Sequence, residues 1–395
     1  MSADKASSAS LPPTLGQIFF SFLRLGATAF GGPAMVAHIR IMAVQEKRWL
    51  DEDGFRKGIA FCQTIPGATA MQTSAYVGLR ARGARGAAAS FIGFGLPSFL
   101  LMLGLSTLYA RFHSLPAVVS AFSGLQALIV ALIAHAAFSF GRSYLKRWQD
   151  IVIAPAAAAL FWAGLHPVFV IVFSFVLGIV LRSGERGARF ATPTGQSSFP
   201  LKVIALLLGL AAVGLGALFF LNRRLFELSL LMLRVDLFAF GGGFASIPII
   251  LHEVVEVRHW MDAKTFIDGI ALGQITPGPI VITATFVGYA LEGVPGALVA
   301  TASIFFPSFF LVLSVWPFFQ RVDSIHFFRK GISGVLCSFV GLLAATSLKF
   351  GLVLSWDLRR IVIAVGAFGA VMLRVNLLYV VLGTVLVTLM LRFLG

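Results

Sequence analysis

The sequence is poor in charge and almost free of cysteine. Asp, Glu, Lys and Arg together make up 12% of its 395 residues, roughly half the share found in soluble proteins. The two cysteines, Cys62 and Cys337, lie in apolar surroundings, which excludes a disulfide framework and a cysteine-based metal cluster. We expect both to be small buried thiols, and we expect the chain to use neither a metal nor a cofactor.

Signatures of membrane-embedded enzymes are missing as well. The sequence has no His-Glu-x-x-His motif, no paired intramembrane aspartate motif and no nucleophile beside a base. Enzyme activity is therefore not expected.

Acidic residues are scarce relative to basic ones, and the formal net charge is +15. The basic residues stand in short clusters between apolar segments rather than on one soluble face. Such clusters set the topology of membrane proteins, so no nucleic-acid partner is expected.

Apolar runs are abundant. They recur from about residue 16 to the C-terminus, and a helix that spans a bilayer needs roughly 20 apolar residues. We therefore expect an all-α polytopic membrane protein with the lipid bilayer as its surroundings. Residues 1–13 are polar and rich in serine, and they are expected to be a disordered tail rather than a signal peptide.

The sequence contains an internal repeat with an offset of about 210 residues. The matched pairs include Arg24 and Arg234, Phe30-Gly31-Gly32 and Phe240-Gly241-Gly242, Trp49 and Trp260, Gln63 to Gly67 and Gln274 to Gly278, and Pro97-Ser98 and Pro307-Ser308. The repeat divides the chain into four parts. These are the tail (1–13), an N-terminal membrane repeat (14–185), a polar linker with an extra apolar segment (186–222) and a C-terminal membrane repeat (223–395).

Each half contains six hydrophobic segments, and the extra apolar run at residues 201–221 is long enough for one crossing. An even number of crossings followed by this linker helix starts the second half on the opposite face. The halves are therefore predicted to be inverted-topology repeats, a recurrent transporter design. If the fifth and sixth segments of each half formed one crossing, the repeats would be parallel.

The first two segments of each half carry Gly and Pro, and we expect them to be broken or re-entrant helices. With that assignment nearly all basic residues of the first half lie on one face, which is then the cytoplasm. The N-terminus is predicted to be cytoplasmic and the C-terminus external. If every segment spanned instead, the termini would keep these places and the charge bias would be weaker.

A Gly pair interrupts the first segment of each half, at Phe30-Gly31-Gly32-Pro33 and at Phe240-Gly241-Gly242. Glycine permits unusual dihedrals and leaves N–H groups at helix ends bare. Such groups are tolerated at membrane depth only inside protein or beside water, and they bind anions. Both motifs are therefore candidate substrate-binding positions, and close helix packing is the alternative.

A second break follows in each half. It comprises Gln63, Thr64, Pro66 and Gly67 in the first half and Gln274, Thr276, Pro277 and Gly278 in the second. Proline removes a backbone donor and kinks the helix, and amide and hydroxyl groups donate to oxyanions without a fixed charge. The alternative is a simple kink in which each Thr bonds back to its own helix.

Arg24 and Arg234 are cations inside apolar segments, where a charge is costly and marks a functional position by default. Guanidinium presents five donors that suit a tetrahedral oxyanion, although Arg24 could instead snorkel to the interface. Asp236, which is matched by Gly26, is predicted to pair with an arginine or to carry a coupling proton. His38 could titrate near neutral pH or be structural.

These motifs resemble the chromate ion transporter family in its long, duplicated form. The resemblance rests on Phe30-Gly31-Gly32-Pro33 to His38, Phe240 to Pro248, Trp49-Leu50, Gln63 to Gly67 with Gly78, Gly83 and Gly86, and Leu96-Pro97-Ser98. The halves differ where Ile275-Thr276 replaces Thr64-Ile65 and Gly243 replaces Pro33, so their sites need not be equivalent residue by residue.

The resemblance implies efflux of chromate, a tetrahedral dianion close in shape and charge to sulfate, across a bacterial inner membrane. The driving force would be the proton gradient or the membrane potential. A sulfate or other oxyanion permease of the same fold is the main alternative, and a passive channel is disfavoured because inverted repeats with broken helices suit alternating access. The oligomeric state stays open, with a homodimer as one arrangement.

Overall fold

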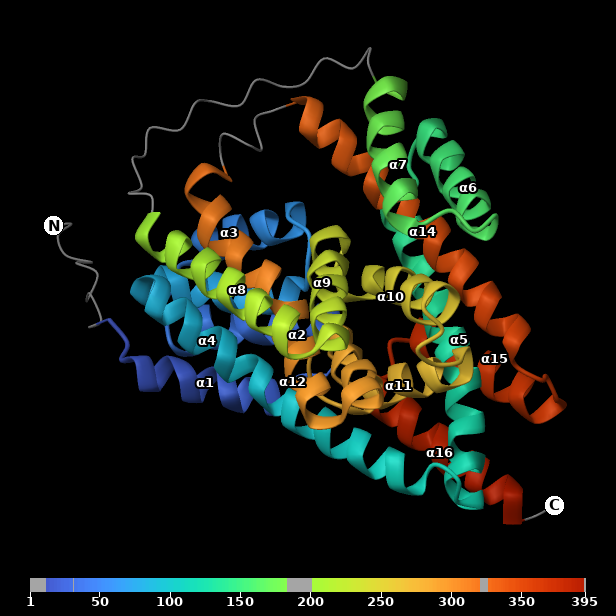
Figure 1. The fold of residues 1–395 in the computed structure, drawn as a ribbon. Helices are drawn as coiled ribbons and strands as arrows, with labels where there is room; N and C mark the ends of the chain where they lie inside the picture. Colours follow the sequence, from blue (N-terminus) through green and yellow to red (C-terminus); the bar gives the residue numbers. More distant parts are fainter. Residues whose placement is uncertain (1–11, 31, 183–200, 320–325, 394–395) are drawn as a thin grey trace, which may run out of the picture.

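The computed structural model describes residues 12–30, 32–182, 201–319 and 326–393. Within these ranges every regular element is a helix (Figure 1). Five helical stretches are long and apolar enough to cross a membrane, namely Thr69–Phe112, Pro116–Tyr144, Leu201–Leu221, Ile280–Phe318 and Phe327–Val353. The expected all-α membrane fold is confirmed.

The first half begins with two interrupted helical segments and ends in three continuous helices. Its elements are α1 (Leu15–Thr28), α2 (Gly32–Arg40), the π-helical turn η1 (Ile41–Glu46), α3 (Glu52–Thr64), α4 (Thr69–Phe112), α5 (Pro116–Tyr144), α6 (Trp148–Trp162) and α7 (Pro167–Leu181).

The second half repeats this order after the linker helix α8 (Leu201–Leu221). Its elements are α9 (Arg223–Phe238), η2 (Gly243–Ala245), α10 (Ser246–Ile250), η3 (Leu251–Val257), α11 (Ala263–Ile275), η4 (Ile280–Ile282), α12 (Thr283–Val315), η5 (Trp316–Phe318), α14 (His326–Val353), α15 (Leu358–Met372) and α16 (Leu377–Phe393).

The repeat extends to the helix caps. α3 begins at Asp51, whose carboxylate accepts from Gly54 N over 3.2 Å, and α11 begins at Asp262, which accepts from Thr265 N over 2.9 Å. A carboxylate at the N-cap satisfies a backbone donor that has no intrahelical partner. Matched sequence positions therefore start matched helices.

α4 is a hairpin rather than one straight rod. Gly83 has a φ of 64°, a value that favours glycine, and the chain reverses there. Gly78 and Gly86 consequently face each other so closely that a side chain on either would overlap the backbone of the other. α12 makes the same turn at Gly293, with a φ of 60°. Each turn joins the second hydrophobic segment of its half to the third, and the re-entry of the first two segments stays a prediction.

The helices form two groups (Figure 1). The broken-helix group contains α1–α4 and α8–α12, and the bundle group contains α5–α7 and α14–α16. The halves exchange partners within the bundle group, because α6 and α7 pack on α14 whereas α15 and α16 pack on α5. α6 and α7 are separate helices of 15 residues each, joined by a tight turn at Gly164 (φ 87°).

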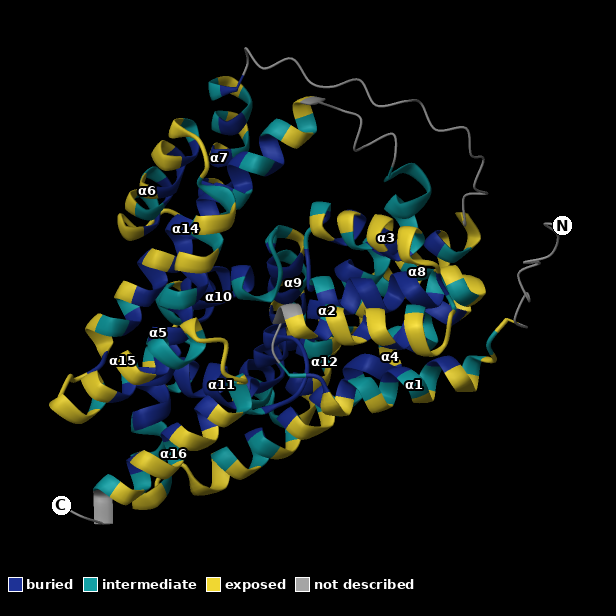
Figure 2. Cartoon of the chain, turned by 180° about the vertical axis from the view of Figure 1, so that it is seen from behind, coloured by how far each residue is buried: buried dark blue, intermediate teal, exposed yellow. Residues whose placement is uncertain are grey.

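Large apolar side chains cover much of the outer surface. Figure 2 shows exposed residues along α1, α6, α15 and α16, and the exposed set includes Phe169, Val213, Phe220 and Tyr379. Such extended apolar exposure fits contact with lipid rather than water. Residues 1–11 of the expected tail, residues 183–185 at the end of the expected N-terminal repeat and residues 186–200 of the expected linker lie outside the described residues.

Candidate functional site

The breaks of the two halves bond to each other. Gly67 N donates to Ala239 O over 3.0 Å, and Gly278 N donates to Ala29 O over 3.1 Å. Gly67 and Gly278 are matched positions of the repeat, as are Ala29 and Ala239. The second break of each half is therefore held by the first break of the other half. This meeting point is formed by residues 29–30, 65–68, 239–242 and 276–279. We call it the crossing, and from here on the word means this contact between the breaks and not a membrane span.

Two matched serines complete the crossing. Ser98 Oγ donates to Pro277 O over 2.6 Å, and Ser308 Oγ accepts from Ala68 N over 3.1 Å. The glycines of the second breaks, with φ values of 121° and 115°, lie against these hydroxyls so closely that a side chain would not fit. Backbone groups freed by the breaks are thus satisfied inside the protein, as they must be at membrane depth.

Asp236 makes the crossing asymmetric. Its side chain is completely buried, and its Oδ2 accepts from Ser308 N over 2.8 Å and from Ser308 Oγ over 2.7 Å. The first half has Gly26 at the matched position, where a side chain would overlap the carbonyl of Phe94. The described partner of Asp236 is therefore a serine and not an arginine.

α3 and α11 carry matched motifs but have different surroundings. Residues 266–274 of α11 are buried without interruption, whereas Arg56, Lys57, Ala60 and Gln63 of α3 are exposed. Gln274, the match of Gln63, is 7% exposed. α11 packs on α5 and α16 of the bundle group, and α3 packs mainly on α4. The second break is accessible in the first half and closed in the second.

The same contrast holds one segment earlier. Ala34, Ala37, His38 and Arg40 of α2 are exposed, whereas residues 245–254 of the second half are all buried. α10 packs on α14 and α7 of the bundle group. In the second half α10 is thus docked on the bundle, whereas α2 of the first half presents an exposed face.

Asp268 links α11, the helix of the closed second break, to α4 and α5. It is 7% exposed and accepts from Tyr109 OH and from Gln126 Nε2, each over 2.8 Å. Tyr109 lies at the end of α4 and Gln126 on α5, so the carboxylate joins α11 to both. The matched residue in the first half is the exposed Lys57.

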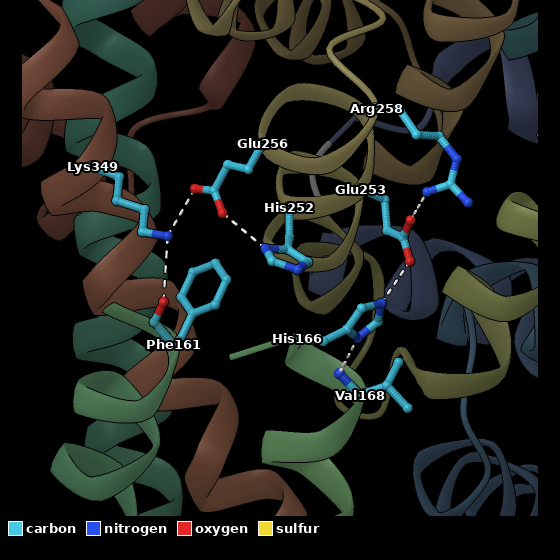
Figure 3. A network of polar contacts seen from close by, with 8 residues as sticks. All are labelled: Phe161, His166, Val168, His252, Glu253, Glu256, Arg258 and Lys349. Atoms are coloured by element: carbon cyan, nitrogen blue, oxygen red, sulfur yellow. Dashed lines mark hydrogen bonds and ion pairs between the residues drawn. The ribbon is translucent and has the colours of Figure 1, made fainter. Parts of the chain in front are cut away.

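Glu253 on η3 provides a second fastening (Figure 3). It is 2% exposed and forms ion pairs with Arg234 and Arg258, and its Oε1 lies 2.6 Å from His166 Nε2. His166 belongs to the turn between α6 and α7, so the contact links the second broken segment to the bundle group. A buried carboxylate with several charge-assisted partners is stable only while they stay together.

Glu256, one turn further along η3, extends this fastening (Figure 3). It accepts from Lys349 Nζ of α14 over 2.7 Å and contacts His252 Nδ1 over 2.8 Å. The Lys349 ammonium also lies 4.0 Å from the centre of the Phe161 ring on α6, a favourable cation–π distance.

The two candidate arginines have different roles in this conformation. Arg24 is exposed on α1, on the same stripe as Phe20, and no hydrogen bond or ion pair joins its guanidinium to another described residue. Arg234 is committed to Glu253, although its Nε is buried without a partner. Arg24 thus retains an unengaged charge within the described residues, whereas Glu253 neutralises Arg234.

The threonines of the second breaks bond to their own helices. Thr64 Oγ1 donates to Phe61 O over 2.8 Å, and Thr276 Oγ1 donates to Gly273 O over 3.0 Å. This is the simple-kink arrangement that the sequence left as the alternative. Neither the Gln63 amide nor the Gln274 amide bonds to another described residue, and of the two Gln63 is the exposed one.

The first breaks are only partly described. Gly241 and Gly242 have φ values of 90° and 98°, which fit glycine, and Phe240 is half-buried beside them. Phe30 is also half-buried, and Gly32 begins α2. Gly31 and the side chain of Pro33 lie outside the described residues.

Several residues of the site were not singled out from the sequence. Ser98 and Ser308 appeared only as matched positions of the repeat, and their hydroxyls prove to hold the crossing together. Glu253 and Gln126 gave no signal, because their partners are far away in the sequence. A polar residue at the same place in both repeats, as at Ser98 and Ser308, was the one available clue.

Comparison with known proteins identifies the family. The chromate transporter family model matches residues 16–179 and again residues 226–389, which confirms two homologous halves. The chain is 42% identical to an uncharacterized transporter of Methanocaldococcus jannaschii, over 96% of this chain and 94% of that one. It is 32% identical to the chromate transport protein of Pseudomonas aeruginosa, over 93% and 89% of the two chains.

A similar level of identity extends to a third relative. The chromate transport protein of Cupriavidus metallidurans is 30% identical over 83% of this chain and 80% of its own length. No solved structure matches the chain significantly. The repeated family match and the long relatives together place the chain in the chromate transporter family, as a membrane transport protein and not an enzyme.

Proposed function

We propose that this chain carries chromate across the membrane and that the described conformation opens the anion site through the first half. The observation that carries the proposal is the contrast between Gln63, which is exposed, and its match Gln274, which is 7% exposed. Relatives of this chain are named as chromate transport proteins. A transporter must expose its site to one side at a time, and a repeat with one open and one closed half meets that need.

If the closed half opened and the open half closed, the anion site would become accessible from the other face of the membrane. In the opposite conformation α3 would dock on the bundle group, while α11 would lose its contacts with α5 and α16. The reciprocal bonds at the crossing support this scheme, because they are alike for the two halves. If the repeats are inverted in the membrane, docking one half closes one face and opens the other.

The anion itself requires a fixed cation. A dianion that enters a cavity of low dielectric loses more hydration free energy than a few neutral hydrogen bonds return. We assign this role to Arg24, because its guanidinium is unengaged among the described residues. Gln63 and the first break would complete the site, and Gln274, Arg234 and the breaks of the second half would form it after the exchange.

The distribution of charge supports a direction and a driving force for transport. The loops of the first half carry most of the basic residues and would face the cytoplasm. An opening on that side suits efflux of a dianion, which the membrane potential or the proton gradient would drive, across the inner membrane of a bacterium. Sulfate is the second candidate substrate, since every donor assigned here recognises oxygen atoms that both anions present.

The test is uptake of radiolabelled chromate into inverted membrane vesicles, with unlabelled sulfate as competitor. We expect saturable uptake that exceeds that of vesicles without the protein. Strong inhibition by equimolar sulfate would make the chain a general oxyanion permease. Absence of uptake under an imposed potential and an imposed proton gradient would refute the proposal.

A further inference from the structure

One buried carboxylate at the crossing has no role in the anion site. Asp236 is 0% exposed, and both bonds that it accepts fall on Oδ2, from Ser308. Its other oxygen, Oδ1, is buried without a hydrogen-bond partner. An ionised carboxylate would leave an uncompensated charge here, which is costly in an apolar interior.

Gln72 leaves a second acceptor unpaired at the same place. Its side chain is 0% exposed, its Nε2 donates to Pro66 O, and its Oε1 is buried without a partner. Both side chains flank Gly67, because a Cβ built there would lie 2.6 Å from Gln72 Nε2 and 3.1 Å from Asp236 Oδ2. The amide of Gln72 and the carboxylate of Asp236 thus lie beside the same glycine, and each has one orphan oxygen. Buried acceptors are nearly always paired, so these oxygens indicate a missing donor.

Charged neighbours do not supply that donor. The titratable and charged groups on elements packed around Asp236 are Arg223, Arg224, Glu227 and Arg234 on α9, Lys202 on α8, Tyr289 and Glu292 on α12, His252, Glu253 and Glu256 on η3, and Tyr76 and Arg80 on the first limb of α4. Arg234 is paired with Glu253, and Tyr76 donates to Gly54 O. No hydrogen bond or ion pair in the described chain joins any of these groups to Asp236.

We propose that Asp236 and Gln72 form the binding site of one exchangeable proton. The proton sits on Oδ1 of Asp236 and is donated in a hydrogen bond to Oε1 of Gln72, so that a single proton satisfies both orphan oxygens. The inference rests on the proposed transport of an anion, which it links to pH. Release of the proton to water leaves a negative carboxylate beside the crossing, and this charge repels a dianion.

The first experiment needs no transport. Infrared difference spectra of the purified full-length protein in detergent are recorded during a pH titration, and the carbonyl band of a protonated carboxylic acid is followed. We expect a band that disappears as the pH rises and that is missing in Asp236→Asn. Its presence at unchanged strength in Asp236→Asn would overturn the proposal, whether or not the protein transports chromate.

Two further variants predict shifts of opposite sign. Gln72→Leu removes the acceptor of the proton, so the neutral form loses stabilisation and the band should vanish at lower pH. Ser308→Ala removes a donor to the ionised form, so the band should persist to higher pH. Glu227→Gln, an exposed position on the same helix, is the matched control and should leave the titration unchanged. Shifts of the same sign in both variants would contradict the shared proton.

Transport supplies the second readout. In vesicles from about pH 6 to 9, the KM of the wild type should rise about tenfold for each pH unit above the midpoint, as one linked proton requires. In Asp236→Asn the KM should not rise with pH in this way. The ratio of variant to wild-type KM at each pH cancels the titration of chromate itself. A KM that responds to replacement of sodium by potassium, and not to pH, would show that the two oxygens bind Na⁺ and would overturn the proton assignment.

Discussion

Removal of the Gln126 amide should shift the equilibrium between the described conformation, in which α11 is docked on the bundle group, and the exchanged conformation, in which α3 would be docked instead. Gln126 Nε2 donates to the nearly buried carboxylate of Asp268 over 2.8 Å, and this bond joins α11 to α5. In the exchanged conformation α11 would have left α5, so the bond exists in one conformation and not in the other. Gln126→Leu keeps the size of the side chain and deletes the donor, while Tyr109 still satisfies Asp268.

The expected shift follows from the strength of that bond. A hydrogen bond to a charged group contributes about 1.5–3 kcal/mol, and each 1.4 kcal/mol changes an equilibrium constant tenfold. Loss of the bond from the described conformation alone should favour the exchanged conformation by roughly 10- to 100-fold. A conformation that is rare in the wild type would then become readily detectable.

The assay is labelling of single cysteines with a membrane-impermeant maleimide, in a background without Cys62 and Cys337. Cysteine replaces Ala60, which is exposed on α3, or its match Ala271, which is 1% exposed on α11. We expect position 60 to react faster in the parent protein. Gln126→Leu should slow its reaction and should accelerate the reaction at position 271.

The matched control is Gln149→Leu on α6, which makes the same chemical change away from α11 and should leave both labelling rates unchanged. If Gln126→Leu accelerates labelling at position 271 without slowing labelling at position 60, α11 has only loosened locally from the bundle group. That result would refute the exchange of roles between the halves. Unchanged rates at both positions would show that the bond does not distinguish the two conformations.

Three further predictions address the site, the topology and the crossing. Arg24→Gln should abolish chromate uptake while the protein still reaches the membrane, and Arg24→Lys should weaken it because the charge remains without the guanidinium fork; normal KM in Arg24→Gln would remove this residue from the site. Reporter fusions after Arg189 and after Gly395 should lie on opposite sides of the membrane, and the same sidedness would exclude inverted repeats. Gly278→Ala should lower the melting temperature in detergent by imposing at least about 1–3 kcal/mol of strain at a φ of 115°, whereas Gly104→Ala, in open helical surroundings, should not.

The sequence was sufficient for the architecture. Long apolar runs with few charges determine a helical membrane protein, because backbone groups in lipid must bond within helices. The repeat, visible at Trp49 and Trp260, predicted two halves that the family match then confirmed. Gly and Pro at the breaks predicted interrupted helices, because these residue types act locally on the backbone they belong to.

Side-chain partners could not be predicted in the same way. The sequence left open whether Thr64 would face a substrate or its own helix, and the structure places its hydroxyl on Phe61 O. For Asp236 the sequence offered an arginine partner or a coupling proton, and the structure replaces the arginine with Ser308, which lies far along the chain. Such contacts depend on how helices distant in sequence pack together, and periodicity within one helix carries no information about them.

The difference in accessibility between the halves became visible only in the tertiary structure. Gln63 and Gln274 stand in matched motifs at the ends of matched helices, and by sequence both should be equally accessible. One is exposed and the other nearly buried, because α11 is docked on α5 and α16 while α3 is not. The sequence predicts two broken segments with matched motifs. Which of them is docked depends on the packing of whole helices against the bundle group, where contacts such as Asp268 with Gln126 and Glu253 with His166 form on one side only.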